Sequence, residues 1–171
     1  MTQPEVLHGY FVTDNGKLAH GAKAATLTEA AKLAGELRTE LIRRDTHAVL
    51  LQYTEEEVIV KDLFHAMSEA AKSVPDRVRA LTGVGLDGAE LYDEAFGTNR
   101  TQPKLFINSF DNASLISEHR GFKNLLLGVH GHYRNPRAHT TRHGSIEARI
   151  DFYDLFSLLS YIHRRLDTSR T

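Results

Sequence analysis

Arginine and histidine side chains concentrate between Glu118 and Glu147, a stretch that contains no acidic residue. Its centre is the segment from Arg134 to His139, and the stretch as a whole holds five of the chain's ten histidines. Guanidinium groups bind phosphate, and imidazole transfers protons near neutral pH. The whole chain has a formal net charge of −1, so this local positive charge indicates a site for chemistry on a phosphate. The alternative, on charge alone, is a solvated basic helix end.

The composition is typical of a single globular domain. The chain has 171 residues, of which 41% are hydrophobic and 25% charged, and it has no cysteine for disulfides or thiolate metal sites. The first ten residues carry no basic segment followed by an apolar run, and no apolar stretch is long enough to cross a bilayer. We therefore expect a cytoplasmic protein without membrane contact. The near-neutral charge argues against a protein that coats nucleic acid, but not against a local site.

Helical periodicity dominates the chain after its first 25 residues. A first helix is expected from Thr26 to about Arg44, and a second follows Thr54 as far as Leu81. Both Thr26 and Thr54 precede a glutamate by three residues, which is the spacing of a capping box. Pro75 lies inside the second helix and should kink or divide it.

Three further helices are expected. A short one occupies residues 89–96 and is closed by Gly97, and the last one runs from residue 146 to about residue 167. Between them, an irregular stretch at residues 98–114 precedes a helix that runs from about residue 115 to Tyr133. Arg134, the first residue of the central segment, therefore lies just beyond the end of this penultimate helix.

Each long helix carries one apolar face. Phe64, Phe122 and Phe152 belong to three of these faces, and we expect the faces to converge on one core. Gly128 and Gly131 lie inside the penultimate helix, where each costs about 1 kcal/mol relative to alanine. Such glycines suit a position where another backbone approaches closely, so they predict a helix–helix contact on that side.

The first 25 residues differ from the rest. Apolar residues flank Asp14-Asn15-Gly16, a sequence typical of the turn of a β-hairpin. We expect a small N-terminal β-hairpin or arm at residues 1–25 and a helical domain at residues 26–171. Since an isolated hairpin is marginal in water, it should lie on the helical body or pair with another chain.

Pro136 should end the penultimate helix, with Arg134 and Asn135 at its end and His139 in the following turn. An all-α bundle whose penultimate helix ends in Arg-Asn-x3-His, followed by a long final helix, resembles the HEPN superfamily. Other segments resemble the Ymh-type family of uncharacterised prokaryotic proteins, a HEPN-like group. These segments are Phe64-His65-Ala66, Asp87-Gly88-Ala89-Glu90-Leu91, Arg120-Gly121-Phe122, Gly128 and His163-Arg164-Arg165-Leu166-Asp167. The resemblance covers roughly Thr26 to Thr168 and implies an all-α, HEPN-like up-and-down helical bundle.

The resemblance implies a metal-independent endoribonuclease without cofactors, whose composite site joins the motifs of two protomers. His139 would be the general base or acid, Arg134 would stabilise charge on the scissile phosphate, and Asn135 would orient His139 or bond phosphate. RNA supplies its own nucleophile, the 2′-hydroxyl, and a second protomer supplies the second histidine of an in-line displacement. The residues expected to bind RNA are Arg120, Lys123, Arg137, Arg142 and His143.

Two alternatives stay open. Some HEPN domains are scaffolds, so the motif suits a non-catalytic dimerisation or RNA-binding module as well. The other alternative is a metal site, because His130-x-His132 and His139-x3-His143 have spacings found in zinc proteins. Against a metal, the stretch offers no Asp, Glu or Cys ligand, and an α-helix turns His130 and His132 about 200° apart. We therefore expect no metal.

The expected partners are RNA and a second copy of the chain, in a homodimer. HEPN toxins act in phage defence, including abortive infection, and in toxin–antitoxin pairs. The resemblance therefore permits an antitoxin or another defence-system protein as a further partner, and it names neither the RNA substrate nor the trigger of activation.

Overall fold

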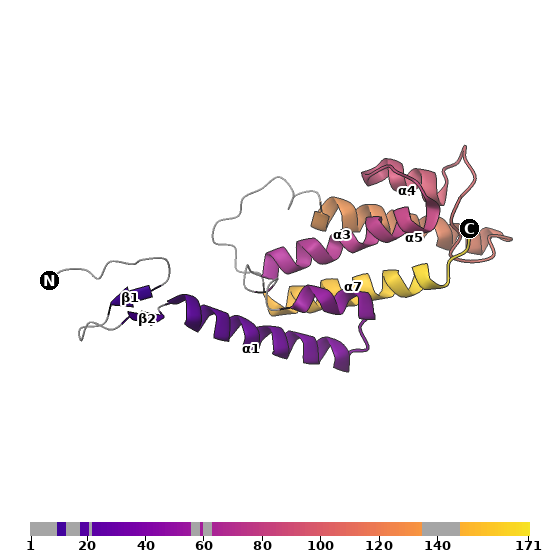
Figure 1. Cartoon of the computed structure of the whole chain (residues 1–171). Coiled ribbons are helices and arrows are strands. Elements are labelled where there is room, and N and C mark those ends of the chain that lie inside the picture. The colour runs from indigo at the N-terminus through magenta and orange to yellow at the C-terminus, as the bar shows by residue number, and fades with distance from the viewer. Residues whose placement is uncertain (1–9, 13–17, 21, 56–58, 60–62, 135–147) are drawn as a thin grey trace.

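A computed structural model describes residues 10–12, 18–20, 22–55, 59, 63–134 and 148–171, with side chains from residue 29 onward except that of Arg134. The described chain is predominantly helical (Figure 1). Its elements, in chain order, are β1 (Tyr10–Val12), β2 (Leu18–His20), α1 (Ala22–Arg43), η1 (Ala48–Thr54), α3 (Leu63–Thr82), α4 (Gly88–Phe96), α5 (Ala113–Val129), η2 (His130–Arg134) and α7 (Arg149–Asp167). η1 is a 3₁₀-helix, and η2 is a single turn of π-helix that continues α5.

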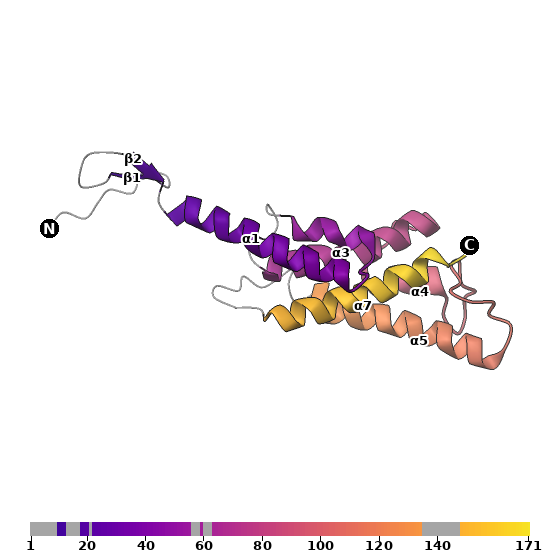
Figure 2. The same cartoon turned by 90° about the horizontal axis from the view of Figure 1, so that it is seen from below.

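The helices form a bundle in which α3 and α7 lie side by side. α4 packs on both α3 and α5, and α1 reaches the body through η1 (Figures 1 and 2). α5 and α7 run in opposite directions along the bundle. No helix within the described ranges is apolar over enough length to span a bilayer.

The apolar face of α7 forms the centre of the core. Its six apolar residues have no more than 1% of their surface exposed, and they are Phe152, Leu155, Phe156, Leu159, Ile162 and Leu166. The rings of Phe152 and Phe156 stack with centroids 4.1 Å apart. Phe122 of α5 is buried in the same core, whereas Phe64 of α3 is only half-buried. The helical faces converge on one core as predicted, but α3 contributes other buried residues to it in place of Phe64.

The predicted capping box at Thr26 is wrong as a helix start. α1 begins at Ala22, so Thr26 lies inside it, and the alanine-rich first turn explains this extension because alanine is the best helix former. Thr54 ends η1, and its hydroxyl donates to the Leu51 carbonyl at 2.7 Å. Just after it, the Ile59 amide makes a helical bond of 3.0 Å to the Glu55 carbonyl, but Glu57, the partner glutamate of the second box, lies outside the described residues, so that box stays a prediction.

Pro75 does not divide α3, which runs without interruption from Leu63 to Thr82. Proline lacks an amide hydrogen, so the carbonyl four residues earlier, at Ala71, receives no helical hydrogen bond from it, a defect that costs about 3 kcal/mol in a helix interior. Ala71, Val74 and Val78 are buried around the proline, and the burial of this face holds the helix together across it.

The N-terminal strands pair antiparallel, with Tyr10 opposite His20 and Val12 opposite Leu18. The predicted turn at Asp14-Asn15-Gly16 lies outside the described residues. Figures 1 and 2 show the strand pair beyond the N-terminal end of α1, away from the helical body. Of the two expected locations, docking on the body is therefore wrong, and pairing with another chain stays a prediction.

The stretch between α4 and α5 is irregular, as expected, but it is tied to the body at several points. Leu105 and Ile107 are buried, and the Phe106 amide donates to the Arg170 carbonyl at 2.8 Å. Arg170 returns the bond to the Phe106 carbonyl at 3.0 Å. α5 begins at Ala113, slightly earlier than expected, because the Asn112 side chain caps it by accepting from the Leu115 amide at 3.0 Å.

Candidate functional site

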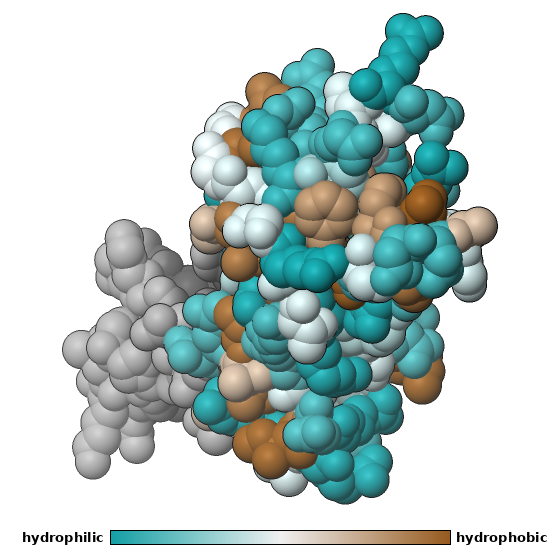
Figure 3. All heavy atoms as spheres, turned by 90° about the vertical axis from the view of Figure 1, so that its right-hand side faces the viewer, coloured by the Kyte–Doolittle hydropathy of each residue, from teal (hydrophilic) through white to brown (hydrophobic). Residues whose placement is uncertain are grey.

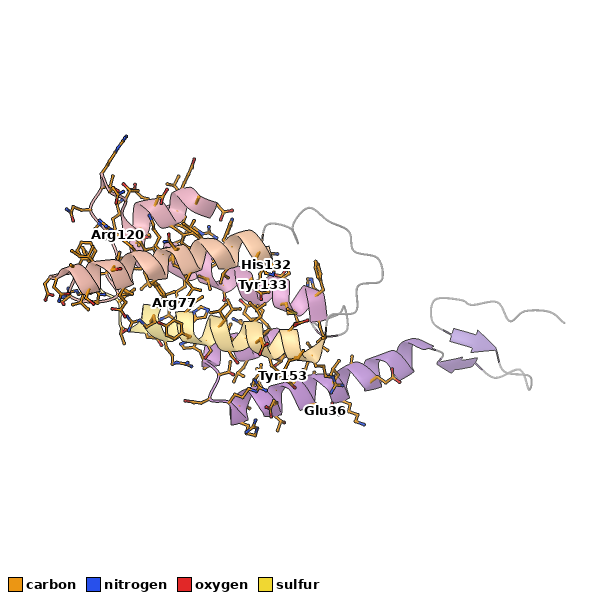
Figure 4. The ribbon with its side chains drawn as sticks, turned by 180° about the vertical axis from the view of Figure 1, so that it is seen from behind. Glu36, Arg77, Arg120, His132, Tyr133 and Tyr153 are labelled. Carbon is orange, nitrogen blue, oxygen red and sulfur yellow. The ribbon has the colours of Figure 1, made fainter. Side chains whose placement is uncertain are left out.

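The expected site residues that the structure describes lie on one continuous rod, α5 followed by η2. Arg120 and Lys123 lie in α5, and Arg134 is the last residue of η2. Arg134 follows Arg120 by 14 positions, which is roughly 21 Å at the rise of a helix. Figure 4 likewise shows Arg120 far along the rod from His132. The basic stretch therefore divides into two separate places.

The other expected site residues lie outside the described part of the chain. They are Asn135, Arg137, His139, Arg142 and His143. The described elements that flank this segment are η2 before it and α7 after it. The end of η2 and the start of α7 lie at the same end of the bundle (Figures 1 and 4). The motif therefore begins at the last residue of η2, and the predicted helix end at Pro136 and the catalytic assignments stay predictions.

The π-turn begins where His130 meets α4. The His130 amide donates to the Leu126 carbonyl, four residues earlier, and also to the Leu127 carbonyl, three residues earlier. Only 8% of His130 is exposed, and its ring lies edge-on to Tyr92 with centroids 6.0 Å apart. A Cβ on Gly88, whose φ is +59°, would stand 3.4 Å from Nε2 of His130. The start of α4 therefore packs on the residue at which α5 becomes η2, and π-turns are frequent at functional sites.

His132 points away from the core on the same turn. It is exposed, and its ring meets the half-buried Tyr133 edge-on at 4.6 Å (Figure 4). His130 and His132 therefore lie on different sides of the rod, one buried and one in solvent. Within the described ranges, no group of three His, Cys, Asp or Glu residues is placed to hold a metal ion.

The helix–helix contact predicted from Gly128 and Gly131 is absent from the described part of the chain. Both glycines are exposed, and apart from the neighbouring backbone of the same helix no heavy atom of the described residues lies within 4 Å of the position where a Cβ would stand. The glycines therefore leave an open strip beside Arg134, and no described neighbour of the same chain accounts for them.

A cluster of polar side chains inside the bundle was not predicted from the sequence. His163 of α7 is completely buried, and its Nε2 lies 2.8 Å from the Ser73 hydroxyl of α3. Its ring stacks on His47 at 5.1 Å, and Nε2 of His47 lies 3.0 Å from the Asp167 carboxylate, to which Arg77 also donates. These five residues come from three segments far apart in sequence, so no local pattern announces them.

The serine–histidine pair in this cluster is structural. The Ser73 hydroxyl lies 2.6 Å from the Ala70 carbonyl and donates there, so Nε2–H of His163 donates to the serine oxygen. Burial, followed by the positive charges of His47 and Arg77, lowers the pKa of His163 to about 4. A neutral histidine is thus held in the core, where it joins α3 to α7 without access for a substrate.

The middle of α5 borders a cavity of about 620 Å³ that lies against the loop after α4. The Lys123 ammonium at its wall donates to the Asp93 carboxylate and to the Gly97 carbonyl, both at 2.9 Å. Gly97 has a φ of +76°, and a Cβ there would lie 2.8 Å from backbone atoms of the loop. Lys123, expected to bind RNA, therefore joins α5 to α4, while Arg120 remains exposed at the cavity.

His119 is a buried residue in the wall of this cavity. Only 1% of it is exposed, and its Nε2 donates to the Phe96 carbonyl at 2.9 Å. Burial lowers the pKa of His119, and the charges of Lys123 and Arg120 act in the same direction. The ring is therefore neutral near pH 7. Sequence reasoning assigned no role to this histidine or to Arg100, the second exposed arginine of the cavity; the only signal was the polar run after Gly97.

One family model matches most of the chain. Its description is "Protein of unknown function (Hypoth_ymh)", and it matches residues 44–166. The matched range includes η1, α3, α4, α5 and η2 and ends one residue before the end of α7, whereas α1 and the strand pair precede it. Comparison with curated proteins and with solved structures gave no match.

Proposed function

The chain belongs to the Hypoth_ymh family, and we propose that its helical domain is a HEPN-like bundle that acts as a metal-independent endoribonuclease. The observation that carries the proposal is the position of Arg134. It ends the turn that extends the penultimate helix, and the remainder of the Arg-Asn-x3-His motif follows directly, before the final helix. The buried contact of His130 with α4 supports it, since this contact holds the first residue of the turn that ends at Arg134.

The proposed reaction is transfer of the phosphoryl group within the RNA chain. The 2′-hydroxyl attacks the adjacent phosphorus and gives its proton to His139, while the bond from phosphorus to the 5′-oxygen breaks. The leaving oxygen takes a proton from His139 of a second protomer, so the products carry a 2′,3′-cyclic phosphate and a 5′-hydroxyl. Arg134 stabilises the charge that develops on the phosphate, and Asn135 orients His139 or bonds phosphate.

The test is cleavage of a mixed RNA pool by the purified protein in excess EDTA. The wild type should cleave, and His139→Ala should not. His132→Ala is the matched control, because this histidine is exposed on the adjoining turn and has no assigned role. Melting temperatures of all three proteins establish that they are folded. Equal cleavage by wild type and His139→Ala would refute the catalytic assignment.

A second candidate function is a non-catalytic HEPN dimerisation or RNA-binding module. The open strip at Gly128 and Gly131 favours it, because a second chain has room to approach there. If neither the wild type nor His139→Ala cleaves RNA but both bind it, this candidate replaces the nuclease. In either form we place the protein in the cytoplasm as a homodimer, in a toxin–antitoxin or phage-defence system in which another protein controls it.

A further inference from the structure

The cavity beside the middle of α5 holds positive charge that the proposed cleavage site does not use. Arg100 and Arg120 line it, and in the described part of the chain neither guanidinium makes a hydrogen bond or an ion pair. The charge of Lys123 is compensated by Asp93, its partner at 2.9 Å. The two free arginines therefore give the cavity a net charge of about two positive, which favours a phosphate group.

The other residues that line the cavity offer contacts that a phosphate alone does not use. The amide side chains of Asn99, Gln102 and Asn124 line the cavity, and each offers both donors and an acceptor. Phe110 adds an aromatic surface, held in place by an edge-on contact with His119 at 5.1 Å. Amides that pair with base edges, together with aromatic or guanidinium planes on which bases stack, are the usual means of binding a nucleobase.

The size and construction of the cavity also fit a small organic ligand. Its volume of about 620 Å³ lies in the range of ligand pockets, which is about 300–1,000 Å³. The loop that forms one side is joined to α4 by backbone hydrogen bonds, since the Lys104 and Leu105 amides both donate to the Ala95 carbonyl at 2.9 Å. Thr98 and Thr101 close the turn with a bond of 3.0 Å between their hydroxyl oxygens. Figure 3 shows the end of the molecule that carries this loop, and its surface is largely hydrophilic.

We propose that this cavity binds a nucleotide, with the phosphate on Arg100 and Arg120 and the base against Phe110 and the amides. The shared chemistry is a phosphate attached to a nucleoside, and it has two sources, a free mononucleotide or one unit of an RNA chain. Only in the second case does the inference rest on the proposed function. The site lies roughly 21 Å from Arg134 along the helical rod, so it is separate from the proposed cleavage centre.

Isothermal titration tests the proposal with the full chain carrying His139→Ala, so that RNA stays intact. The probes are the four ribonucleoside 5′-monophosphates, a short single-stranded oligoribonucleotide and inorganic phosphate. A nucleotide should bind in a saturable way, and Arg100→Ala and Arg120→Ala should each weaken binding about tenfold, because each removes a charged hydrogen-bond donor. Arg120→Lys should weaken it less than alanine but not restore it, because lysine keeps the charge without the planar fork. Arg43→Ala, on α1, is the matched control and should change nothing.

The outcomes separate this inference from the cleavage proposal. Binding of a free mononucleotide, or of the oligoribonucleotide alone, supports the site and identifies its source. Absence of saturable binding by every nucleotide probe overturns it, as does equal binding by the His139→Ala protein with and without the arginine substitutions, at unchanged melting temperatures. Inorganic phosphate that binds as tightly as the nucleotides overturns the base contact. Binding without RNA cleavage by the wild type refutes only the nuclease, and cleavage without binding at the cavity refutes only this site.

Discussion

The middle of α5 and the turn that follows its C-terminal end are built in different ways, although the sequence gives both of them positive charge. In the middle of α5, Lys123 is joined to α4 and a braced loop encloses a cavity that Arg120 borders. At the C-terminal end, the helix passes into η2, and His132 stands in solvent two residues before Arg134, the last residue of η2. The first place is a walled cavity, and the second is a helical turn with an exposed histidine.

The difference teaches that neighbouring charges in a sequence need not serve one ligand group. A helix of 14 residues separates Arg120 from Arg134 by roughly 21 Å. That separation exceeds the screening length of about 8 Å at physiological ionic strength, so the two arginines do not stabilise the same phosphate. We therefore treat the middle of α5 as the proposed binding site and the segment that begins at Arg134 as the proposed reaction site.

The sharpest test of this division compares the two arginines in RNA cleavage. Arg134→Ala should lower the cleavage rate about 100- to 1,000-fold, as expected for the loss of one group that stabilises transition-state charge. Arg120→Ala should lower it by no more than about tenfold, through weaker binding. Initial rates in excess EDTA provide the measurement. Equal losses of rate in the two variants would show that Arg120 and Arg134 contribute to one site.

Histidines distinguish the buried and open parts of the molecule through the pH dependence of stability. The pKa of His163 is about 4 in the folded protein against 6.5 without the fold, so between these values the unfolded chain binds a proton that the folded chain does not. Stability should therefore fall by about 3 kcal/mol as the pH drops through this window. The lowered pKa of His119 acts in the same direction.

Urea unfolding at a series of pH values between 7 and 4 measures this effect. His163→Gln should flatten the profile relative to the wild type, whereas the exposed His132→Gln should leave it unchanged. A wild-type profile as flat as that of His163→Gln would contradict the assignment of a neutral buried histidine.

Of two residues that line the cavity, Lys123 should contribute more than Arg120 to the stability of the fold. Lys123→Met should lower the free energy of unfolding by about 1 to 2 kcal/mol, because it leaves the Gly97 carbonyl and Asp93 without their partner. Arg120→Met should change it by less than about 0.5 kcal/mol, because that side chain is exposed. Denaturant titration of both variants checks the pair, and equal effects would remove the distinction.

The smallest expected effect concerns the two glycines near Arg134, Gly128 and Gly131. Gly128→Ala and Gly131→Ala should each stabilise the monomer by about 0.5 to 1 kcal/mol, since a Cβ meets nothing within 4 Å. Gly121→Ala, in equally open space on α5, is the matched control. If the strip at Gly128 and Gly131 contacts a second protomer, light scattering should show weaker dimers for those two variants and not for the control. A dimer unaffected by any of them would place the interface elsewhere.

Periodicity predicted the helices and much of the core correctly, because the apolar residues that recur at helical spacing in α7 share one buried face. Helix starts were harder to predict. A capping box is a local signal, and at Thr26 the preceding alanines extend the helix past it. At Thr54 the chain forms a 3₁₀-helix whose Leu50 is fully buried, a tertiary contact that no local pattern encodes.

The candidate sites show the same limit. The Arg-Asn-x3-His motif is contiguous in sequence, so it could be recognised at once. The cavity combines Arg100 with residues of a helix that begins more than ten positions later, and the Ser73 to His163 bond spans 90 residues. Such groups meet only through the packing of α3, α5 and α7, which fixes partners that spacing alone does not reveal.

The paired hydrogen bonds between Phe106 and Arg170 have a consequence for how the molecule opens. They join the last residues of the chain to the connection that leads towards the cavity, and Arg165 adds a bond to Glu118 on α5. Local unfolding of the final turn of α7 therefore releases this connection as well. The cavity rim and the chain's C-terminal end form one cooperative unit, whose amides should exchange with solvent through a shared opening event.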